Sequence, residues 1–479
     1  MTGRLLAIVL VCCALLEPRI ARASEVQHWI VTSDIHFDPF ADVRLIARLN
    51  AAPSERWRAI FQSAGAAPFS PYGADANYPL LESALDSMKT DDANPAVVIV
   101  AGDFLARDFR AKYQRALRTA DEAQYESFVD KTVAFLAREF RGAFPRAQLV
   151  PVIGNDDSYC GEYAIAPQSA FLSHMATQWA GAADARDAAS WAAQFSKGGY
   201  YAVELPVGGA RAIVLNDVYW STHYKDTCSE DSTGAADEMA WLRTVLATNT
   251  QRSPIWIIAH IPPGADVAAS LRSAPKSIAM FLSGQYNDDF VSQLGSDRSN
   301  VVMAIAGHTH MNAFRIVGVG AGSSPVPMLV VPSISPALAN NPAYEVLNVD
   351  SATASVLDYH VVVLDDLSAL AKNGKHAARW RREYDFASVF GPGPLDAKHL
   401  GAIEHAMFAD GRLRERYKQY YDSESGRAPI AEYAWRATWC ANVALTQTSY
   451  AACAMPQVQL SLPPQPTAPP GVPSPVPSP

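Results

Sequence analysis

The sequence lacks a basic tract, an apolar run long enough to cross a bilayer, and any Cys-x-x-Cys pair. A net charge of −9 over 479 residues argues against a protein that binds a nucleic-acid duplex, although a small anionic substrate stays compatible. The apolar run over residues 5–16 is too short to span a membrane comfortably, so we expect no stable insertion. Because no two cysteines have the Cys-x-x-Cys spacing, metal binding by these side chains is disfavoured.

Residues 1–23 have the pattern of a signal peptide. Arg4 precedes the apolar run, and residues 21–23 supply small side chains at the cleavage position. An uncleaved anchor and a lipoprotein signal at Cys12 are the alternatives, but Cys12 lies inside the apolar run. The sequence also lacks an Asn-x-Ser/Thr sequon. This favours a bacterial periplasmic or secreted protein over an animal secretory one.

Four cysteines follow this segment: Cys160, Cys228, Cys440 and Cys453. An even number of cysteines in an exported chain favours disulfides, and four cysteines allow three pairings. Proximity in sequence favours Cys440–Cys453, which leaves Cys160–Cys228. The second pair would stiffen the region that follows residue 155.

Five apolar runs end on side chains that bind divalent metals. Residues 96–101 form one such run, which is rich in β-branched residues and is followed by Gly102 and Asp103. A continuous run of this kind predicts a strand buried on both faces, as in a parallel sheet. Ligands of such sheets gather outside the carboxyl ends of the strands. The other four runs end at Asp34 and His36, at Asn155, at His260, and at His308 and His310. Each motif is weak alone, but the order of all five indicates a metal site.

The rest of the pattern predicts an α/β protein with further segments at both ends. Helical periodicity over residues 78–89 and 116–138 alternates with the strands, which is the βαβ signature. Residues 199–216 predict strands of a second sheet. Beyond residue 365 the pattern becomes helical and aromatic, and residues 455–479 contain ten prolines and no charge. We predict a signal peptide over 1–23, a main domain over 24–365, a helical subdomain over 366–454 and a Pro-rich disordered tail over 455–479.

The order of the five motifs resembles that of the calcineurin-like metallophosphoesterases, which is D-x-H, G-D, G-N-[HD], H and G-H-x-H. The resemblance covers roughly residues 28–365. Further matches resemble the acid sphingomyelinase-like phosphodiesterase branch of that family. They comprise residues 33–39, 83–85, 158–161, 260–264, 332–336 and 341–342, together with the helical region that contains Trp439 and Cys440.

This resemblance implies a four-layer αββα sandwich that carries two divalent metal ions. It places Asp34, His36 and His310 on one ion and Asn155, His260 and His308 on the other, with Asp103 bridging both. Two such ions can share a hydroxide that attacks a phosphoryl group. Zinc is the first choice for this ligand set, and manganese and iron also fit it.

Two positions depart from the pattern of the family. Asp156 stands where relatives have a histidine after the asparagine, and Arg107 replaces a histidine four residues after the bridging aspartate. As catalytic residues, Asp156 could donate a proton and Arg107 could hold phosphoryl oxygens. The alternative is that the two side chains only form a salt bridge with each other.

We therefore expect an exported phosphoesterase that cleaves a small phosphodiester, such as a nucleotide or a phospholipid headgroup. The chain has no room for a saposin-like domain before the first strand, which favours a soluble substrate over a bilayer lipid. A phosphomonoesterase or a nucleotide pyrophosphatase could use the same centre. A catalytically weak metal-binding or ligand-binding protein is the alternative from another class. Nothing in the sequence indicates an oligomeric state.

Overall fold

The computed structural model describes residues 25–461, except 66, 185, 229–232, 274–276, 297–299, 321 and 374–376; for 455–461 it describes only the course of the backbone. The predicted signal peptide and the part of the predicted tail after Ser461 lie outside the described residues. Within the described residues, no helix is both long enough and apolar enough to cross a membrane.

The first sheet has six strands in the order β12-β11-β10-β1-β2-β3. Its parallel half places β1 beside β2 and β2 beside β3, and β10 joins β1 in the antiparallel sense. The remaining strands continue the antiparallel half. The strand bounds are β1 (Val26–Thr32), β2 (Val97–Val100), β3 (Gln148–Pro151), β10 (Ala343–Asp350), β11 (Val356–Asp365) and β12 (Arg379–Asp385).

The second sheet has six strands in the order β4-β5-β6-β7-β9-β8. Its four inner strands are parallel, and β4 and β8 are antiparallel edge strands. The predicted second sheet over residues 199–216 corresponds to β4 and β5. The strand bounds are β4 (Tyr201–Glu204), β5 (Arg211–Val214), β6 (Ile255–Ile258), β7 (Val301–Ala306), β8 (Ala313–Val317) and β9 (Val326–Val330).

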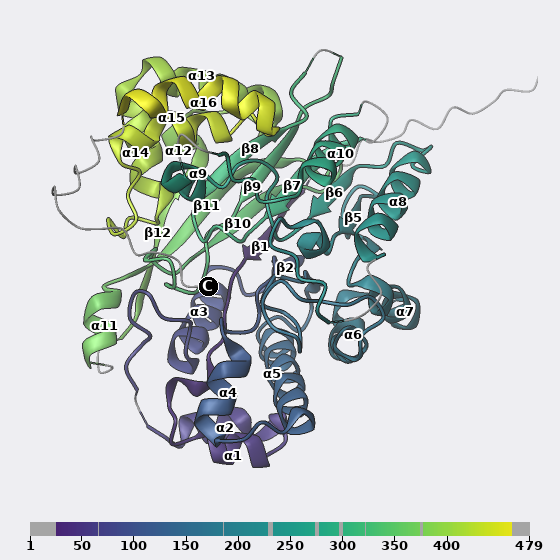
Figure 1. The fold of residues 1–479 in the computed structure, drawn as a ribbon, viewed down its shortest axis with the longest axis vertical. Helices are drawn as coiled ribbons and strands as arrows, with labels where there is room; N and C mark the ends of the chain where they lie inside the picture. The colour runs from purple at the N-terminus through teal and green to yellow at the C-terminus, as the bar shows by residue number, and fades with distance from the viewer. Residues whose placement is uncertain are drawn as a thin grey trace, which may run out of the picture.

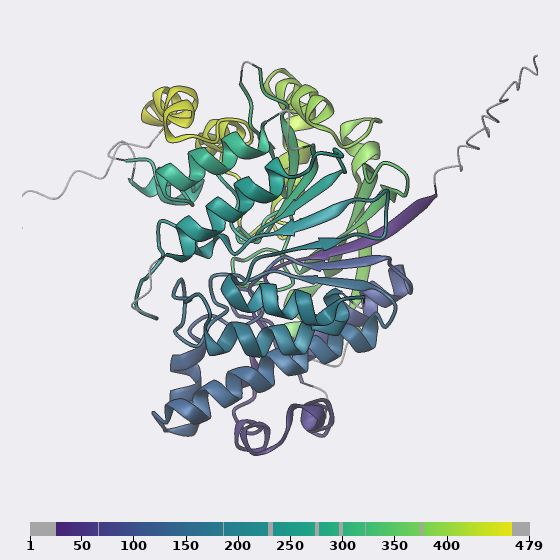
Figure 2. The ribbon, with the colours of Figure 1, turned by 90° about the vertical axis from the view of Figure 1, so that its right-hand side faces the viewer.

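Helices cover the outer faces of both sheets, which gives the predicted α/β sandwich. In Figure 1 and Figure 2 the strands lie between the blue helices of the first half and the teal helices α8 and α10. The helix bounds are α1 (Ile46–Ala51), α2 (Trp57–Gln62), α3 (Tyr78–Asp91), α4 (Phe109–Leu117), α5 (Glu122–Ala143), α6 (Ala170–Ala183), α7 (Ala188–Gly198), α8 (Gly234–Ala247), α9 (Val267–Ser273), α10 (Gly284–Leu294), α11 (Leu367–Asn373), α12 (Phe386–Phe390), α13 (Ala397–Ala409), α14 (Gly411–Tyr421), α15 (Glu432–Ala441) and α16 (Gln447–Ser461).

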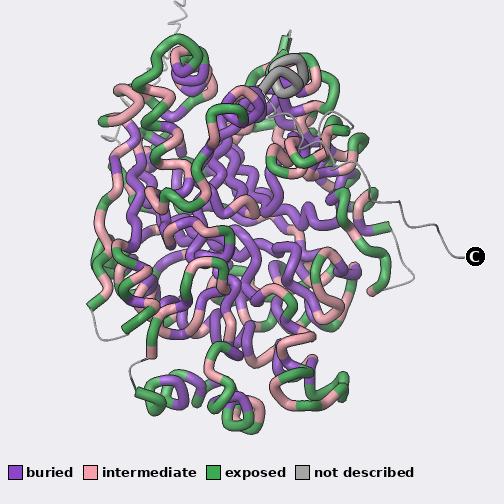
Figure 3. Tube along the Cα trace, turned by 60° about the vertical axis from the view of Figure 1, so that its left-hand side comes forward, coloured by how far each residue is buried: buried purple, intermediate pink, exposed green. Residues whose placement is uncertain are grey.

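The core lies where the two sheets face each other. β2 and β6 are buried along their whole length, as their continuous apolar sequences predict. Trp29 of β1 and Trp256 of β6 are both 0% exposed, and their ring centroids are 4.5 Å apart. Figure 3 shows this concentration of buried residues along the strands. The contact between the two indoles packs β1 of the first sheet against β6 of the second.

The predicted helix over residues 116–138 is wrong at its beginning, because the structure has two helices there. Arg118 ends α4 with a left-handed φ of 53°. α5 begins after Asp121, whose side chain accepts a hydrogen bond from the N–H of Gln124. This N-terminal cap satisfies a helix donor that would otherwise lack a partner, so the helix begins there.

The C-terminal region is helical, as predicted, with two differences in detail. α13 packs on β8 and β9, and the yellow helices α15 and α16 lie together above the second sheet in Figure 1. Residues 379–385, which the prediction placed in the helical region, instead form β12 at the edge of the first sheet. This strand has two aromatic residues, Trp380 and Tyr384, and the indole N–H of Trp380 donates to Ser83 Oγ of α3. α16 also continues beyond the predicted boundary at 454.

Both predicted disulfides are present. Cys160 pairs with Cys228, and Cys440 pairs with Cys453. The second bridge joins α15 to α16. The first connects two loops that flank the carboxyl ends of the strands.

Glu345 of β10 is a buried carboxyl group whose ionisation opposes folding. Neither of its oxygens has a hydrogen-bond partner among the described residues, and burial raises its pKa from 4.5 to about 8. In the unfolded chain the group loses its proton near pH 4.5. The unfolded state is therefore favoured progressively as the pH rises from about 4.5 to about 8.

We therefore expect Glu345→Gln to be increasingly stabilising, relative to the parent protein, as the pH rises over this range. The difference in the free energy of unfolding should be small at pH 4.5 and reach a few kcal/mol, at roughly 1.4 kcal/mol per pKa unit, by pH 8. Urea unfolding at a series of pH values measures it, with the exposed Glu55→Gln as the control. A difference that does not change with pH would contradict the prediction.

Candidate metal centre

The candidate metal-binding side chains come together because the strands that carry them end at the same edge. β1, β2 and β3 are parallel neighbours in the first sheet, and β6 and β7 are parallel neighbours in the second. The first sheet contributes Asp34, His36, Asp103 and Asn155, and the second contributes His260, His308 and His310. Six of these seven side chains fall into two groups with ligand atoms within 4.8 Å of one another, and Asn155 contacts one of the groups.

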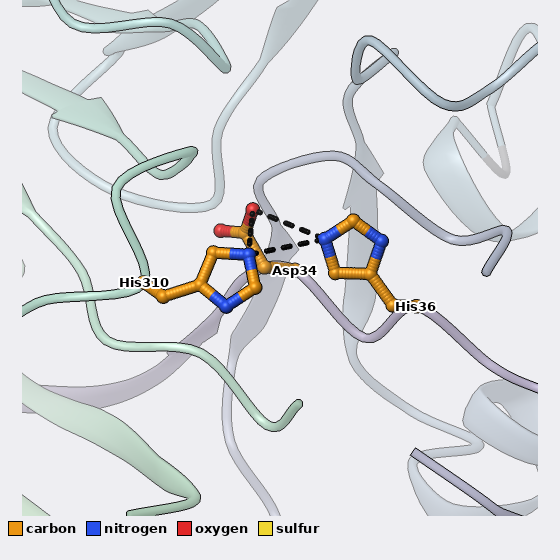
Figure 4. A group of neighbouring side chains, drawn as sticks. All are labelled: Asp34, His36 and His310. Carbon is orange, nitrogen blue, oxygen red and sulfur yellow. Dashed lines mark hydrogen bonds and ion pairs between the residues drawn. The ribbon is translucent and has the colours of Figure 1, made fainter. Parts of the chain in front are cut away.

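The first group consists of Asp34, His36 and His310. Figure 4 shows both imidazole rings turned toward the Asp34 carboxylate. Asp34 Oδ1 lies 3.3 Å from His310 Nε2 and 3.7 Å from His36 Nε2, and the two nitrogens are 3.1 Å apart. All three residues are buried. These atoms therefore face a common point.

The second group consists of Asp103, His260 and His308, with Asn155 beside it. His260 Nε2 lies 3.2 Å from Asp103 Oδ2 and 3.1 Å from Asn155 Oδ1. The same Asp103 oxygen is 3.4 Å from His36 Nε2 of the first group. Asp103 Oδ2 therefore stands between the two groups.

In His36, His260 and His310, a hydrogen bond at Nδ1 fixes the orientation of the ring. The Nδ1 of His36 lies 3.2 Å from the Leu105 carbonyl oxygen, and that of His260 lies 2.7 Å from the Ala101 carbonyl oxygen. His310 Nδ1 is 3.0 Å from Ser333 Oγ, whose own hydrogen is donated to a backbone carbonyl. A carbonyl oxygen only accepts, and this hydroxyl has already donated, so Nδ1 carries the proton in each ring. In the neutral form of each ring the Nε2 lone pair therefore faces the group of ligand atoms, as metal coordination requires.

The backbone at these strand ends has an unusual conformation, and two glycines beside it leave space for neighbouring side chains. Asp34, His36, Asp103, His308 and His310 all have a positive φ, between 42° and 67°. Non-glycine residues rarely adopt this conformation, which costs free energy unless the surroundings impose it. The two preceding glycines leave room for side chains of the site. A Cβ at Gly102 would collide with the ring of His260, and one at Gly307 would collide with Ser33 Oγ.

The donor set fits a divalent metal. Asp34 Oδ1 is buried and accepts no hydrogen bond from the described residues, although it faces two imidazole nitrogens. Burial lowers the pKa of His308 to about 3 and that of His310 to about 4, so both rings are neutral. Burial opposes protonation of His36, but the neighbouring Asp103 and Asp34 raise its pKa to about 10. A cation at this point would replace that proton as the partner of the carboxylates.

Two buried aspartates support the site, and the sequence analysis missed them. Asp157 accepts hydrogen bonds from the backbone N–H groups of Phe104 and Leu105 at 2.8 and 3.0 Å, and from that of Gly154 at 2.9 Å. Asp217 accepts from the backbone N–H groups of His260 and Ile261, which follow β6. The position of Asp157, directly after the Asn155 motif, was a signal that could have indicated its role.

Arg107 and Asp156 lie apart and do not form the salt bridge that the alternative interpretation predicted. The Nε of Arg107 is 2.7 Å from Asp75 Oδ1. Asp75 is almost fully buried and is also paired with Lys112 at 2.6 Å. Asp156 is buried too, and its Oδ2 lies 3.7 Å from Nδ1 of His36. That Asp156 donates a proton stays a prediction.

The sequence matches one protein family and several phosphodiesterases. The sequence profile of the calcineurin-like phosphoesterase family matches residues 29–312. Acid sphingomyelinase-like phosphodiesterase 3b of Homo sapiens is 24% identical over 432 residues, which cover 86% of each chain. Sphingomyelinase phosphodiesterase D of Dictyostelium discoideum is 26% identical over 67% of this chain and 66% of its own. Cyclic GMP-AMP phosphodiesterase SMPDL3A of Mus musculus is 22% identical over 89% of this chain and 91% of its own.

Proposed function

This chain belongs to the calcineurin-like phosphoesterase family, which is metal-dependent. We propose that it hydrolyses small soluble phosphodiesters at two divalent ions. The observation that carries the proposal is the position of Asp34 Oδ1. Among the described residues this buried oxygen accepts no hydrogen bond, and it faces the Nε2 atoms of His36 and His310. Such an arrangement is costly without a cation to bind.

The proposed ligands divide as the sequence predicted. Asp34, His36 and His310 would hold one ion, and Asn155, His260 and His308 the other. The Oδ2 of Asp103, between His36 and His260, supports its role as the bridge. Two divalent ions at such a centre activate water and neutralise charge on the phosphoryl oxygens. Zinc is the proposed metal, because imidazole and carboxylate ligands suit it, and manganese and iron are the other metals to test.

Arg107 is proposed to bind a phosphoryl oxygen of the substrate. Its guanidinium is held from one side by Asp75 and by the Gly73 carbonyl, which leaves N–H groups for an anion. Lys112 pairs with both Asp75 and Asp38, and this fixes the position of Asp75. A guanidinium held in this way is well suited to an anionic oxygen.

The proposed substrate is a soluble diester, and the proposed location is outside the cytoplasm. The names of the relatives support a diester over a monoester, since they include a cyclic GMP-AMP phosphodiesterase and sphingomyelinase-type phosphodiesterases. Both disulfides support an oxidising compartment, either the periplasm or the medium into which a protein is secreted.

A metal analysis combined with a substrate panel tests the proposal. We expect two ions per chain by elemental analysis and hydrolysis of bis(p-nitrophenyl) phosphate in preference to p-nitrophenyl phosphate. Removal of the metal by chelation should lower turnover at least ~10³-fold, since the ions contribute several kcal/mol and each 1.36 kcal/mol is tenfold in rate. Adding back zinc should restore the activity.

Two results of this panel would contradict the proposal. One ion per chain would exclude the two-ion centre. Absence of turnover on every diester by fully metal-loaded protein would indicate a metal-binding protein instead.

On the same substrates, Arg107→Ala should lower kcat/KM about 10- to 100-fold, because it removes one charge-assisted hydrogen bond worth ~1.5–3 kcal/mol. The exposed Arg44→Ala serves as its control.

A further inference from the structure

We propose that His223 donates the proton to the oxygen that leaves the phosphorus, an inference that rests on the proposed function. An alkoxide is a poor leaving group, and a positioned acid accelerates its departure. His36, His260 and His310 have their Nε2 atoms turned toward the metal centre and their Nδ1 atoms occupied. These three imidazoles therefore have no free N–H group for the leaving oxygen.

Among the described histidines that lie outside the metal centre, His223 has a ring contact with Tyr163, which itself packs against the centre. Its ring centroid lies 5.3 Å from that of Tyr163, and Tyr163 packs edge-on against His308 at 6.3 Å. The remaining described histidines have other surroundings, on strands and helices away from the strand ends. They are His28, His174, His360, His399 and His405.

A second set of contacts independently places this loop at the site. The backbone N–H of Thr222 donates to the Phe281 carbonyl oxygen at 3.0 Å. The ring of Phe281 packs edge-on against His308, with centroids 5.3 Å apart. Thr222 thus contacts Phe281, and His223 contacts Tyr163. The rings of Phe281 and Tyr163 both pack against His308.

The loop that carries His223 is held firmly against the loop that follows Asn155. The Cys160–Cys228 disulfide joins the two loops covalently. Lys225 adds two hydrogen bonds, from its N–H to the Tyr163 carbonyl oxygen at 2.8 Å and from Nζ to the Glu162 carbonyl oxygen at 3.0 Å. His223 is therefore kept in place even though it is exposed.

The ring of His223 is available to a substrate. The residue is exposed, and its recorded hydrogen bond uses the backbone N–H, which donates to Ser221 Oγ. Within the described residues, no hydrogen bond occupies its ring nitrogens. The rival groups are less suitable. Asp156 is buried against His36, and the guanidinium of Arg107 is paired with Asp75.

The proposed step balances as an in-line displacement. The oxygen of a water molecule forms a bond to phosphorus, while the bond from phosphorus to the leaving oxygen breaks and its electron pair stays on that oxygen. The N–H proton of the His223 imidazolium passes to the leaving oxygen and gives an alcohol. The attacking water loses a proton to solvent, and the neutral imidazole regains one from solvent.

The test compares His223→Gln with the parent protein, both loaded with metal, on two diesters of thymidine. In the dinucleoside monophosphate the leaving group is an alkoxide, and in the p-nitrophenyl ester of thymidine 5′-phosphate it is a nitrophenolate that needs no proton. We expect kcat/KM to fall about 10²- to 10⁴-fold on the first substrate and less than about threefold on the second. His174→Gln, on α6, is the matched control and should change neither.

Several outcomes would overturn the inference. Equal losses on both substrates, or no loss on either, would show that His223 does not protonate the leaving group. A selective loss in Tyr163→Phe or Asp156→Asn, with none in His223→Gln, would assign the proton to that residue. If the parent protein hydrolyses neither these esters nor any other diester of the panel, the proposed function itself fails. Metal content and thermal melting of each variant show that the centre and the fold are intact.

Discussion

Asp103→Asn is expected to lower kcat/KM at least ~10³-fold on every phosphoester, nitrophenyl esters included. Asp103 Oδ2 lies within 3.4 Å of Nε2 of both His36 and His260, so it is the proposed bridge between two ions. Asparagine retains the size of the side chain but loses the charge that two cations share. A loss of ~4 kcal/mol in stabilisation of the transition state corresponds to about three decades in rate.

The measurement pairs steady-state kinetics with elemental analysis of the purified variant. We expect fewer than two ions per chain, in contrast to the effect of His223→Gln, which should leave the metal in place. Asp92→Asn is the control, because Asp92 lies next to the end of α3 and pairs with His28. Full metal content together with undiminished hydrolysis would show that Asp103 does not bridge the ions.

Trp256→Ala is expected to lower the free energy of unfolding by about 3–5 kcal/mol. Replacement of a buried tryptophan by alanine removes apolar contacts and leaves a cavity. The Trp256 indole contacts Trp29 across the two sheets, and its N–H donates to the Ala354 carbonyl oxygen at 3.0 Å. The variant also leaves that buried oxygen without this donor, which adds to the loss.

Urea unfolding followed by circular dichroism measures this change. Tyr433→Ala is the matched control, since Tyr433 is 46% exposed and its loss should change stability by no more than ~0.5 kcal/mol. A similar small effect of Trp256→Ala would mean that the contact between the indoles does not hold the sheets together.

Sequence alone predicted the two-sheet fold and the side chains that converge, because both depend on local patterns. Buried parallel strands have continuous apolar sequences, and β2 and β6 fit that pattern. Polar residues at the ends of parallel strands meet at one edge of a sheet, so the meeting of Asp103 with Asp34 and Asn155 followed from the order of the runs. That His260 joins them from the second sheet followed from the resemblance to the family.

The supporting contacts could not be predicted in this way. The carboxylate of Asp157 binds backbone N–H groups more than fifty residues away in sequence, and Arg107 meets Asp75 only when two loops fold together. β12 was missed because an edge strand pairs on one side, which weakens its apolar pattern. The approach of His223 to Tyr163 likewise depends on how two loops pack, which no local pattern encodes.

The two groups at the centre draw their members from both sheets, and this makes the site a cross-link. His36 and His310 are 274 residues apart in sequence, yet their Nε2 atoms are 3.1 Å apart. An ion held by both would join distant parts of the folded chain, whereas the unfolded chain does not bring these ligands together. Metal binding would then stabilise the fold in proportion to the logarithm of the free ion concentration. The supply of metal would set the lifetime of the protein as well as its rate of turnover.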